Sequence, residues 1–243
     1  MRFAPNRHPY GPDYEFYESA RDTGPRSIAY WSSRFYAELV RRRTPRGARV
    51  LEIGCGLGGV LRHLERDYGT SGVDLSSFAL DRARSDLPRS TLAAAEAAEL
   101  PFRNQTFDAV LAKHVLEHIA DPAIALAELA RVLRSPGGLL VYGTPNADNP
   151  LRPFKGNDWI GVRDPTHVSV LPPAKWFALT AASGFEIERA FADGFWDVPY
   201  LRVVPAFVQL ALFAAPAAVQ VLAGRPLIPF RYGESLIVIA RRR

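Results

Sequence analysis

The sequence predicts an α/β fold, with a doubly wound, mostly parallel sheet that carries helices on both faces. Short apolar runs typical of buried strands alternate with longer segments in which apolar residues recur at helical spacing. The first apolar run ends in the glycine-rich turn Val50-Leu-Glu-Ile-Gly-Cys-Gly-Leu-Gly-Gly59, a typical link from strand to helix in such sheets. Because ligands bind these sheets at the carboxyl ends of the strands, we expect the functional site there.

The individual elements follow in chain order. Residues before about 27 are rich in proline, glycine, tyrosine and charge, and predict an irregular arm. The apolar residues of segment 27–43 fall on one face of a helix. Asp121 and Pro122 mark a helix start, since aspartate caps the first turn and proline suits its first position. We expect strands at 49–53, 72–75, 107–112, 139–143 and 235–240, and helices at 60–68, 77–85, 122 to about 133, and 173–183.

The glycine turn and the acid that follows it predict a site for an adenosine-containing cofactor. Gly54, Gly56 and Gly59 satisfy the GxGxxG pattern, and Asp74 ends the next apolar stretch 20 positions after Gly54. Glycines let the backbone approach a ligand closely, and the acid can accept hydrogen bonds from two ribose hydroxyls. Glu52 lies where a dinucleotide-binding strand is normally apolar, and a nicotinamide enzyme remains the alternative.

The order of the motifs VLEIGCGxG, VDLS, ELPF, FDAV, LEH and LRSPGGLL resembles that of class I S-adenosylmethionine-dependent methyltransferases. The resemblance covers residues 50–146 and extends more loosely through the segment 164–167 to the C-terminus. It implies a Rossmann-like, seven-stranded sheet with an N-terminal helical lid. It further implies methyl transfer from S-adenosylmethionine to a small-molecule or lipid-linked acceptor, with oxygen expected as the receiving atom. A non-catalytic member that binds the cofactor or a partner protein is the alternative from another class.

The same resemblance assigns cofactor contacts to residues at the strand ends. Glu52 is expected at the amino end of the methionine moiety, the backbone of the turn under the cofactor, and Asp74 at the ribose. Glu96, five positions before Pro101, is expected at the adenine amino group, although many relatives carry aspartate there. The complete set of expected cofactor residues is Glu52, Gly54, Cys55, Gly56, Asp74, Leu75, Glu96, Ala97 and Lys113. For Cys55 we expect a small residue that fills the turn, with a nucleophile as the less favoured alternative.

Two histidines are the candidate catalytic residues. His167 lies in a polar loop before the helix at 173–183, where loops reach over the acceptor, and an ordinary histidine can remove a hydroxyl proton near neutral pH. Asp164 either orients this histidine or starts a turn. His114 begins the segment His114-Val-Leu-Glu-His118, which matches a zinc-peptidase pattern but overlaps the LEH motif above. It also resembles a divalent-ion set of some quinone-biosynthesis O-methyltransferases, so His114, Glu117 and His118 are metal candidates, although no metal is expected.

Composition narrows the setting of this 243-residue chain. Its length suits one domain, and its single cysteine favours a reducing compartment. The net charge of +5 is concentrated in the arginine runs 41–43 and 241–243, which form no continuous stripe, and no nucleic-acid partner is expected. The first residues have no apolar core typical of a signal peptide. We therefore expect a cytoplasmic protein, with peripheral contact at the inner face of the membrane as an option.

The segment 203–222 departs from the strand–helix rhythm because it contains no charged residue. It is long enough to cross a bilayer, but its prolines and glutamines, and the strand that follows, argue against a crossing. An apolar cap over the acceptor, a surface that dips into lipid and a dimer interface all remain possible, and the oligomeric state is open. The single domain is divided into an arm and lid helix (1–45), a cofactor-binding core (46–146), an acceptor-side part (147–197), an apolar insertion (198–232) and a last strand with a basic tail (233–243).

Overall fold

Seven strands form one sheet in the order β3-β2-β1-β4-β5-β7-β6 in the computed structural model, which describes residues 24–201 and 203–243. β1 to β5 all run parallel to one another, whereas β7 runs antiparallel to both β5 and β6. The predicted mostly parallel, seven-stranded sheet is therefore confirmed. The strands are β1 (Arg49–Ile53), β2 (Gly69–Asp74), β3 (Thr91–Ala94), β4 (Ala109–Lys113), β5 (Leu139–Pro145), β6 (Phe185–Ala192) and β7 (Ser235–Arg242).

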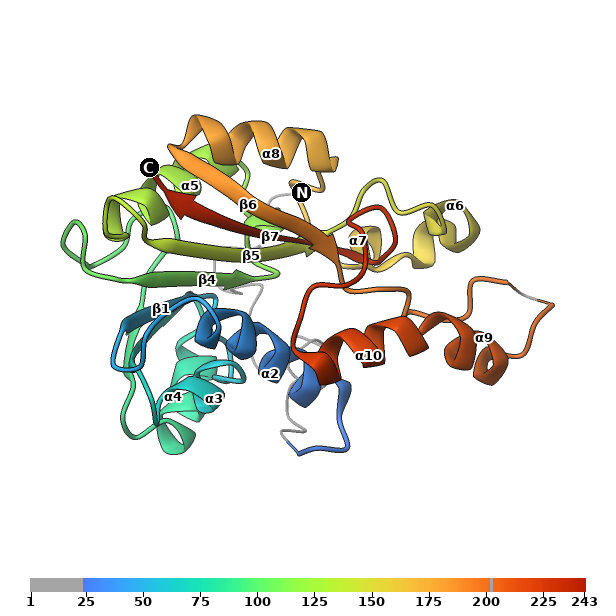
Figure 1. Cartoon of the computed structure of the whole chain (residues 1–243), viewed down its shortest axis with the longest axis horizontal. Coiled ribbons are helices and arrows are strands. Elements are labelled where there is room, and N and C mark those ends of the chain that lie inside the picture. The colour runs from blue at the N-terminus through green and yellow to red at the C-terminus, as the bar shows by residue number, and fades with distance from the viewer. Residues whose placement is uncertain (1–23, 202) are drawn as a thin grey trace.

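Helices cover both faces of this sheet (Figure 1). α2 (Ile28–Arg41), α3 (Leu61–Leu64) and α4 (Ser77–Asp86) lie on one face, and α5 (Pro122–Val132) and α8 (Pro173–Ala182) lie on the other. The predicted start of α5 is confirmed, because the Asp121 side chain accepts a hydrogen bond from the Ala123 amide and proline follows it. The shorter elements are η1 (Leu116–His118), α6 (Arg152–Lys155), η2 (Gly156–Asp158) and α7 (Ile160–Arg163).

The core has two layers because side chains alternate across each strand. In β5, Leu139 and Val141 pack towards α2, whereas Leu140 and Tyr142 pack towards α5 and α8. Burial on both faces explains why this strand reads as a continuous apolar run. The alternation fixes the register of the strands and hence the positions of the residues at their carboxyl ends.

One expectation needs correction. The helix predicted for 60–68 is α-helical only over Leu61–Leu64, because the amide of Gly69 bonds to the Ala48 carbonyl and draws the chain into β2. The predicted lid helix, α2, packs as a layer of the domain, with its buried residues against β1, β4 and β5. It also reaches the strand ends, where the Ser33 hydroxyl lies 3.4 Å from the Lys113 ammonium and the Tyr36 ring lies 5.6 Å from it. Residues 1–23 of the predicted arm fall outside the described residues.

The apolar insertion forms the helices α9 (Ala206–Phe213) and α10 (Ala215–Ala223). They project sideways from the end of the sheet, and α10 lies beside α2 (Figure 1). Among the described residues, no single helix is long and apolar enough to cross a membrane. The two helices meet that test only as a pair, bent by 41°. Because the chain enters the insertion from β6 and leaves it into β7, adjacent strands of one sheet, both ends of the insertion return to the same edge.

Candidate cofactor and acceptor site

The predicted cofactor residues lie along one edge of the sheet. β1, β2 and β4 are parallel neighbours, so Glu52, Asp74 and Lys113 lie at or next to the carboxyl ends of adjacent strands. The strand order reverses between β1 and β4, which is where open α/β sheets bind their ligands. The structure thus brings together the residues that the motifs predicted separately.

The glycine turn is held by the Asp74 carboxylate. One Asp74 oxygen accepts the Gly56 amide at 2.7 Å, and the other accepts the Ser76 amide at 2.8 Å. Gly54 has a φ of +62°, and a Cβ there would lie 2.4 Å from the Val115 side chain. A larger residue is excluded both by the backbone conformation and by space. The turn therefore keeps its backbone open at the strand ends.

Cys55 fills the base of this turn with its side chain buried. It packs with Leu61 and Leu80, and a Cβ added at Gly72 would meet its sulfur at 2.8 Å. Burial raises the pKa of the thiol, so the side chain stays protonated and unreactive. This geometry favours the interpretation of Cys55 as a small residue that fills the turn. Only its backbone is then available for contact with a cofactor.

Glu52 is buried and Lys113 is half-buried near the carboxyl ends of two neighbouring strands. Burial raises the pKa of Glu52 to about 8, and the nearby Lys113 ammonium opposes that rise. Burial also lowers the pKa of Lys113. The Glu52 Oε2 atom has no hydrogen-bond partner among the described residues. A buried carboxylate oxygen without a donor fits the ammonium group of a methionine moiety, which would supply that donor.

The expected adenine contacts lie beside Asp74. The Ala95 amide bonds to the Asp74 carbonyl, which extends the β2–β3 pairing and brings the loop with Glu96 and Ala97 to this side. Leu75 is exposed at the end of β2, where it can contact a flat ring. These predicted residues therefore lie near one another at the carboxyl ends of β2 and β3, and their contact with the cofactor stays a prediction.

His114 follows β4 in an uncommon conformation. Its φ is +55°, a region that few residues other than glycine adopt, and its amide bonds to the Gly143 carbonyl of β5. Its Nδ1 atom lies 3.3 Å from Glu117 Oε1. On the neighbouring strand β5, the backbone of Gly143 lies close to the Tyr36 side chain, since a Cβ on Gly143 would lie against the Tyr36 hydroxyl.

His167 lies with Glu117 and His118 on the acceptor side. Its Nδ1 atom is 3.1 Å from the Gly161 carbonyl, and its Nε2 atom is 3.9 Å from one oxygen each of Glu117 and Asp164. The rings of His118 and His167 are 4.6 Å apart. Possible ligand atoms of Glu117, His118 and His167 lie within 4.8 Å of one another, so the metal-capable group includes His167 in place of His114. Asp164 accepts hydrogen bonds from the Thr166 amide and hydroxyl, which is the pattern of a residue that starts a turn.

Two buried acids at the same edge were not predicted. Asp193 follows β6 and accepts bonds from the Trp196 indole and from the amide and hydroxyl of Ser235. Burial raises its pKa, and the nearby His114 opposes the rise, which places this acid beside the predicted site. The position of Asp193 directly after the last residues of β6, Phe191 and Ala192, was the only available signal.

The second unpredicted acid, Glu234, precedes β7. It accepts bonds from Tyr200, from the Trp159 indole at 2.8 Å and from the Asn149 amide at 2.9 Å. Burial raises its pKa to about 7. Glu234 therefore joins the loop after β5, the start of the insertion and the last strand into one support for the acceptor side.

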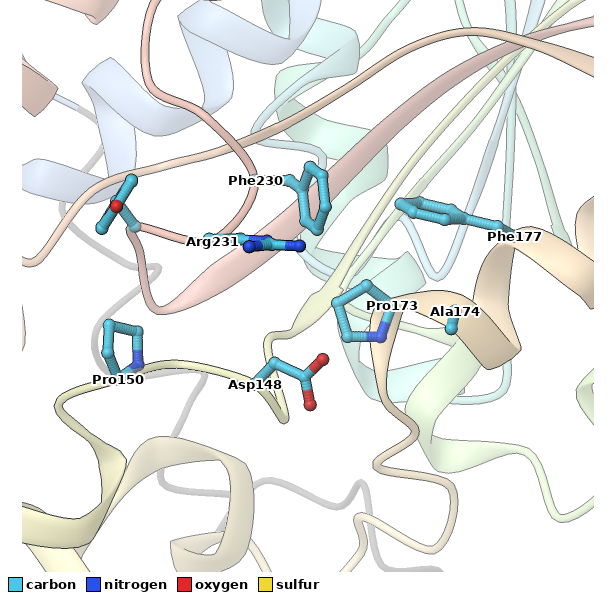
Figure 2. A pocket seen from close by; sticks show the side chains of 8 residues that line it. Asp148, Pro150, Pro173, Ala174, Phe177, Phe230 and Arg231 are labelled. Atoms are coloured by element: carbon cyan, nitrogen blue, oxygen red, sulfur yellow. The ribbon is translucent and has the colours of Figure 1, made fainter.

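A hollow of about 410 Å³ opens beside these acceptor-side loops. Figure 2 shows Phe177 and Phe230 on one side of it, with Asp148 and Arg231 nearby. The two phenylalanine rings meet edge to face at 5.6 Å. Its lining includes none of the predicted cofactor residues, so it is separate from the glycine turn and largely apolar.

Comparison with known proteins agrees with this geometry. Residues 51–142 match a family model described as a methyltransferase domain. A probable S-adenosylmethionine-dependent methyltransferase of Mycolicibacterium smegmatis is 31% identical over 225 residues, which cover 83% of this chain and 82% of that protein. A fatty-acid O-methyltransferase of the same species is 34% identical over 117 residues, 46% of this chain and 42% of that protein. The chain spans about half the length of further curated relatives that it matches.

Solved structures show the same fold. A methyltransferase of Thermotoga maritima, described as a possible histamine N-methyltransferase, superposes with a TM-score of 0.64 at 18% identity. The match covers 89% of this chain and 91% of that one. At this identity the likeness extends to the fold alone.

Proposed function

The chain belongs to the S-adenosylmethionine-dependent methyltransferase family, and on that premise we propose that it methylates an oxygen of an apolar or lipid-linked acceptor. It is an enzyme whose cofactor is S-adenosylmethionine. The described residues fit this cofactor, because the turn at Gly54 has no room for a side chain and the buried Glu52 oxygen lacks a donor. When bound, the cofactor supplies an electrophilic methyl group, which the protein must align with the acceptor.

The observation that supports oxygen as the methyl acceptor is the geometry of His167. A carbonyl oxygen only accepts hydrogen bonds, so the contact with Gly161 places the proton of the neutral ring on Nδ1. Nε2 is then the basic atom. Nε2 would take the hydroxyl proton of the acceptor, and the bound cofactor would supply the methyl group that the acceptor oxygen receives. The carboxylates of Glu117 and Asp164, each 3.9 Å away, stabilise the positive charge that forms on the ring.

Two features support an apolar acceptor. The hollow bordered by Phe177 and Phe230 lies beside the acceptor-side loops and suits an apolar group. One relative is named a fatty-acid O-methyltransferase, although the chain covers only 42% of it. Fatty acids, lipid-linked phenols and other apolar hydroxyl compounds are therefore the first acceptor classes to test.

The experiment is a comparison of His167→Ala with the wild type in release of S-adenosylhomocysteine with a panel of hydroxylated lipids and phenols. We expect turnover to fall about 10²- to 10⁴-fold, with cofactor affinity unchanged, because the base acts only in the chemical step. His63→Ala, which alters a histidine of α3 that packs on Tyr30 and contacts neither Glu117 nor His167, serves as the matched control and should retain turnover. If turnover of His167→Ala falls only a few fold, His167 is not the general base.

The test also separates a base from a metal ion. Glu117, His118 and His167 could together hold a divalent cation that activates the acceptor. Under the proposed mechanism, turnover of the wild type is indifferent to a chelator. Inhibition by a chelator that added magnesium or zinc reverses would replace the base with metal activation.

A further inference from the structure

The helices α9 and α10 have their polar residues inside and their apolar residues outside. Gln209 and Gln220, the polar residues of these two helices, are 1% and 0% exposed. On the outer side, Phe207 is 75% exposed, Leu212 68% and Leu222 72%. Helices on the surface of a protein surrounded only by water normally show the opposite arrangement.

The inward glutamines fix this orientation. The Gln209 amide accepts the backbone amides of Tyr200 and Leu201 and donates to the carbonyls of Leu201 and Val204. Gln220 similarly joins α10 to the ends of two other segments, since it donates to the Ala192 carbonyl and accepts the amides that follow Pro226. Turning either helix over would break these bonds inside the protein. The outward apolar face is therefore a built feature of the fold.

The charges around this face match an anionic surface. Segment 203–224 contains no charged residue, whereas Arg225 follows it directly and Arg231 lies six residues further on. Arg189 reaches the chain just after this segment and donates to the Pro226 carbonyl at 3.0 Å. None of these three exposed arginines forms an ion pair with a carboxylate of the described residues. A second copy of the chain would bring the same cations to the interface, whereas anionic lipid headgroups would neutralise them.

We propose that α9 and α10 form a membrane-docking surface that seats the enzyme on anionic bilayers, with the apolar side chains among the acyl chains and the arginines at the headgroups. The pair lies at the interface without crossing it, because both ends of the insertion return to the same edge of the sheet. The surface is joined directly to the acceptor side, since a Cβ on Gly194, next to Asp193, would lie 2.9 Å from Ala217 of α10. An acceptor embedded in the bilayer would therefore meet the site from this direction.

The test is flotation of the full chain with phosphatidylcholine vesicles and with vesicles that also contain phosphatidylglycerol. We expect the wild type to float with the anionic vesicles at low salt. The double variant Phe207→Gln and Leu222→Gln should partition at least 10-fold less. Its matched control is Ile28→Gln with Ile124→Gln, which alters two exposed apolar residues outside the insertion and should float like the wild type. Arg225→Gln with Arg231→Gln should lose the preference for anionic vesicles.

The result does not depend on turnover, so it stands or falls apart from the proposed acceptor chemistry. Circular dichroism and cofactor affinity of each variant check that the fold is retained. A wild type that stays with the unbound protein at low salt would overturn the proposal, as would equal flotation of the Phe207 double variant. A dimer in solution that the same double variant dissociates would assign the face to a second copy instead.

Discussion

The buried carboxyl of Glu52 couples cofactor binding to the release of a proton. Its pKa is raised to about 8, because burial penalises the charged form more than Lys113 stabilises it. At pH 7 the free enzyme therefore carries the proton in about nine of ten molecules. The ammonium of the methionine moiety would favour the charged carboxylate and lower that pKa, so binding expels the proton.

The magnitude follows from the same pKa. We expect about 0.9 proton to be released per cofactor bound at pH 7, and the apparent affinity to rise up to about tenfold per pH unit between pH 6 and 7.5. Calorimetry in two buffers with different ionisation enthalpies, such as phosphate and Tris, counts the proton directly. The variant Glu52→Gln keeps the shape but cannot titrate, so it should bind more weakly and release no proton. Equal proton release by the wild type and this variant would refute the assignment of Glu52.

Two further predictions concern Asp74 and Glu234, two other acids at this edge of the sheet. Asp74→Ala should weaken cofactor binding by roughly 2–4 kcal/mol, the value of two charge-assisted hydrogen bonds to the ribose hydroxyls. The control Asp81→Ala, which alters an exposed side chain of α4, should not weaken binding. Unchanged affinity of Asp74→Ala by calorimetry would show that Asp74 is not part of the site. Glu234→Gln should change how stability depends on pH. The folded wild type holds a proton there up to about pH 7, whereas the unfolded chain loses it near 4.5, so its free energy of unfolding falls between these values. Relative to the variant, the wild type should lose about 3 kcal/mol across this window in urea titrations, and parallel curves would contradict the raised pKa.

The sequence was sufficient to predict where the expected cofactor residues lie in the fold, because the signals for these positions are local. The bounds of β1 match the prediction, and the N-cap of α5 could be read from Asp121 and Pro122 alone. Glu52, Asp74 and Lys113 meet because parallel strands align their carboxyl ends, which is a property of the fold class rather than of any distant contact. The cofactor side therefore followed once the strands were recognised.

The acceptor half depends on contacts between distant segments. His118 and His167 are 49 positions apart in sequence, and only the path of the loop after β5 brings their rings to 4.6 Å. Asp193 and Glu234 belong to no motif, and each is held by a distant partner. Asp193 bonds to Ser235, 42 positions away, and Glu234 bonds to Tyr200, 34 positions away. The helix predicted for 60–68 is longer than the observed α3, because the spacing of apolar residues does not show where the chain enters β2. These features could not be obtained from periodicity.

The antiparallel pairing of β6 with β7 has a consequence for how such enzymes diversify. Neighbouring antiparallel strands need only a tight turn to connect them, so residues 193–234 are not required to close the sheet. The free-energy cost of closing a loop grows slowly with its length, and a long excursion is tolerated here without disturbing the register of the strands. Residues 193–234 can thus differ between relatives while the rest of the fold stays the same. The half that carries Glu52 and Asp74 would keep its geometry while the excursion selects where, and on which molecules, the enzyme works.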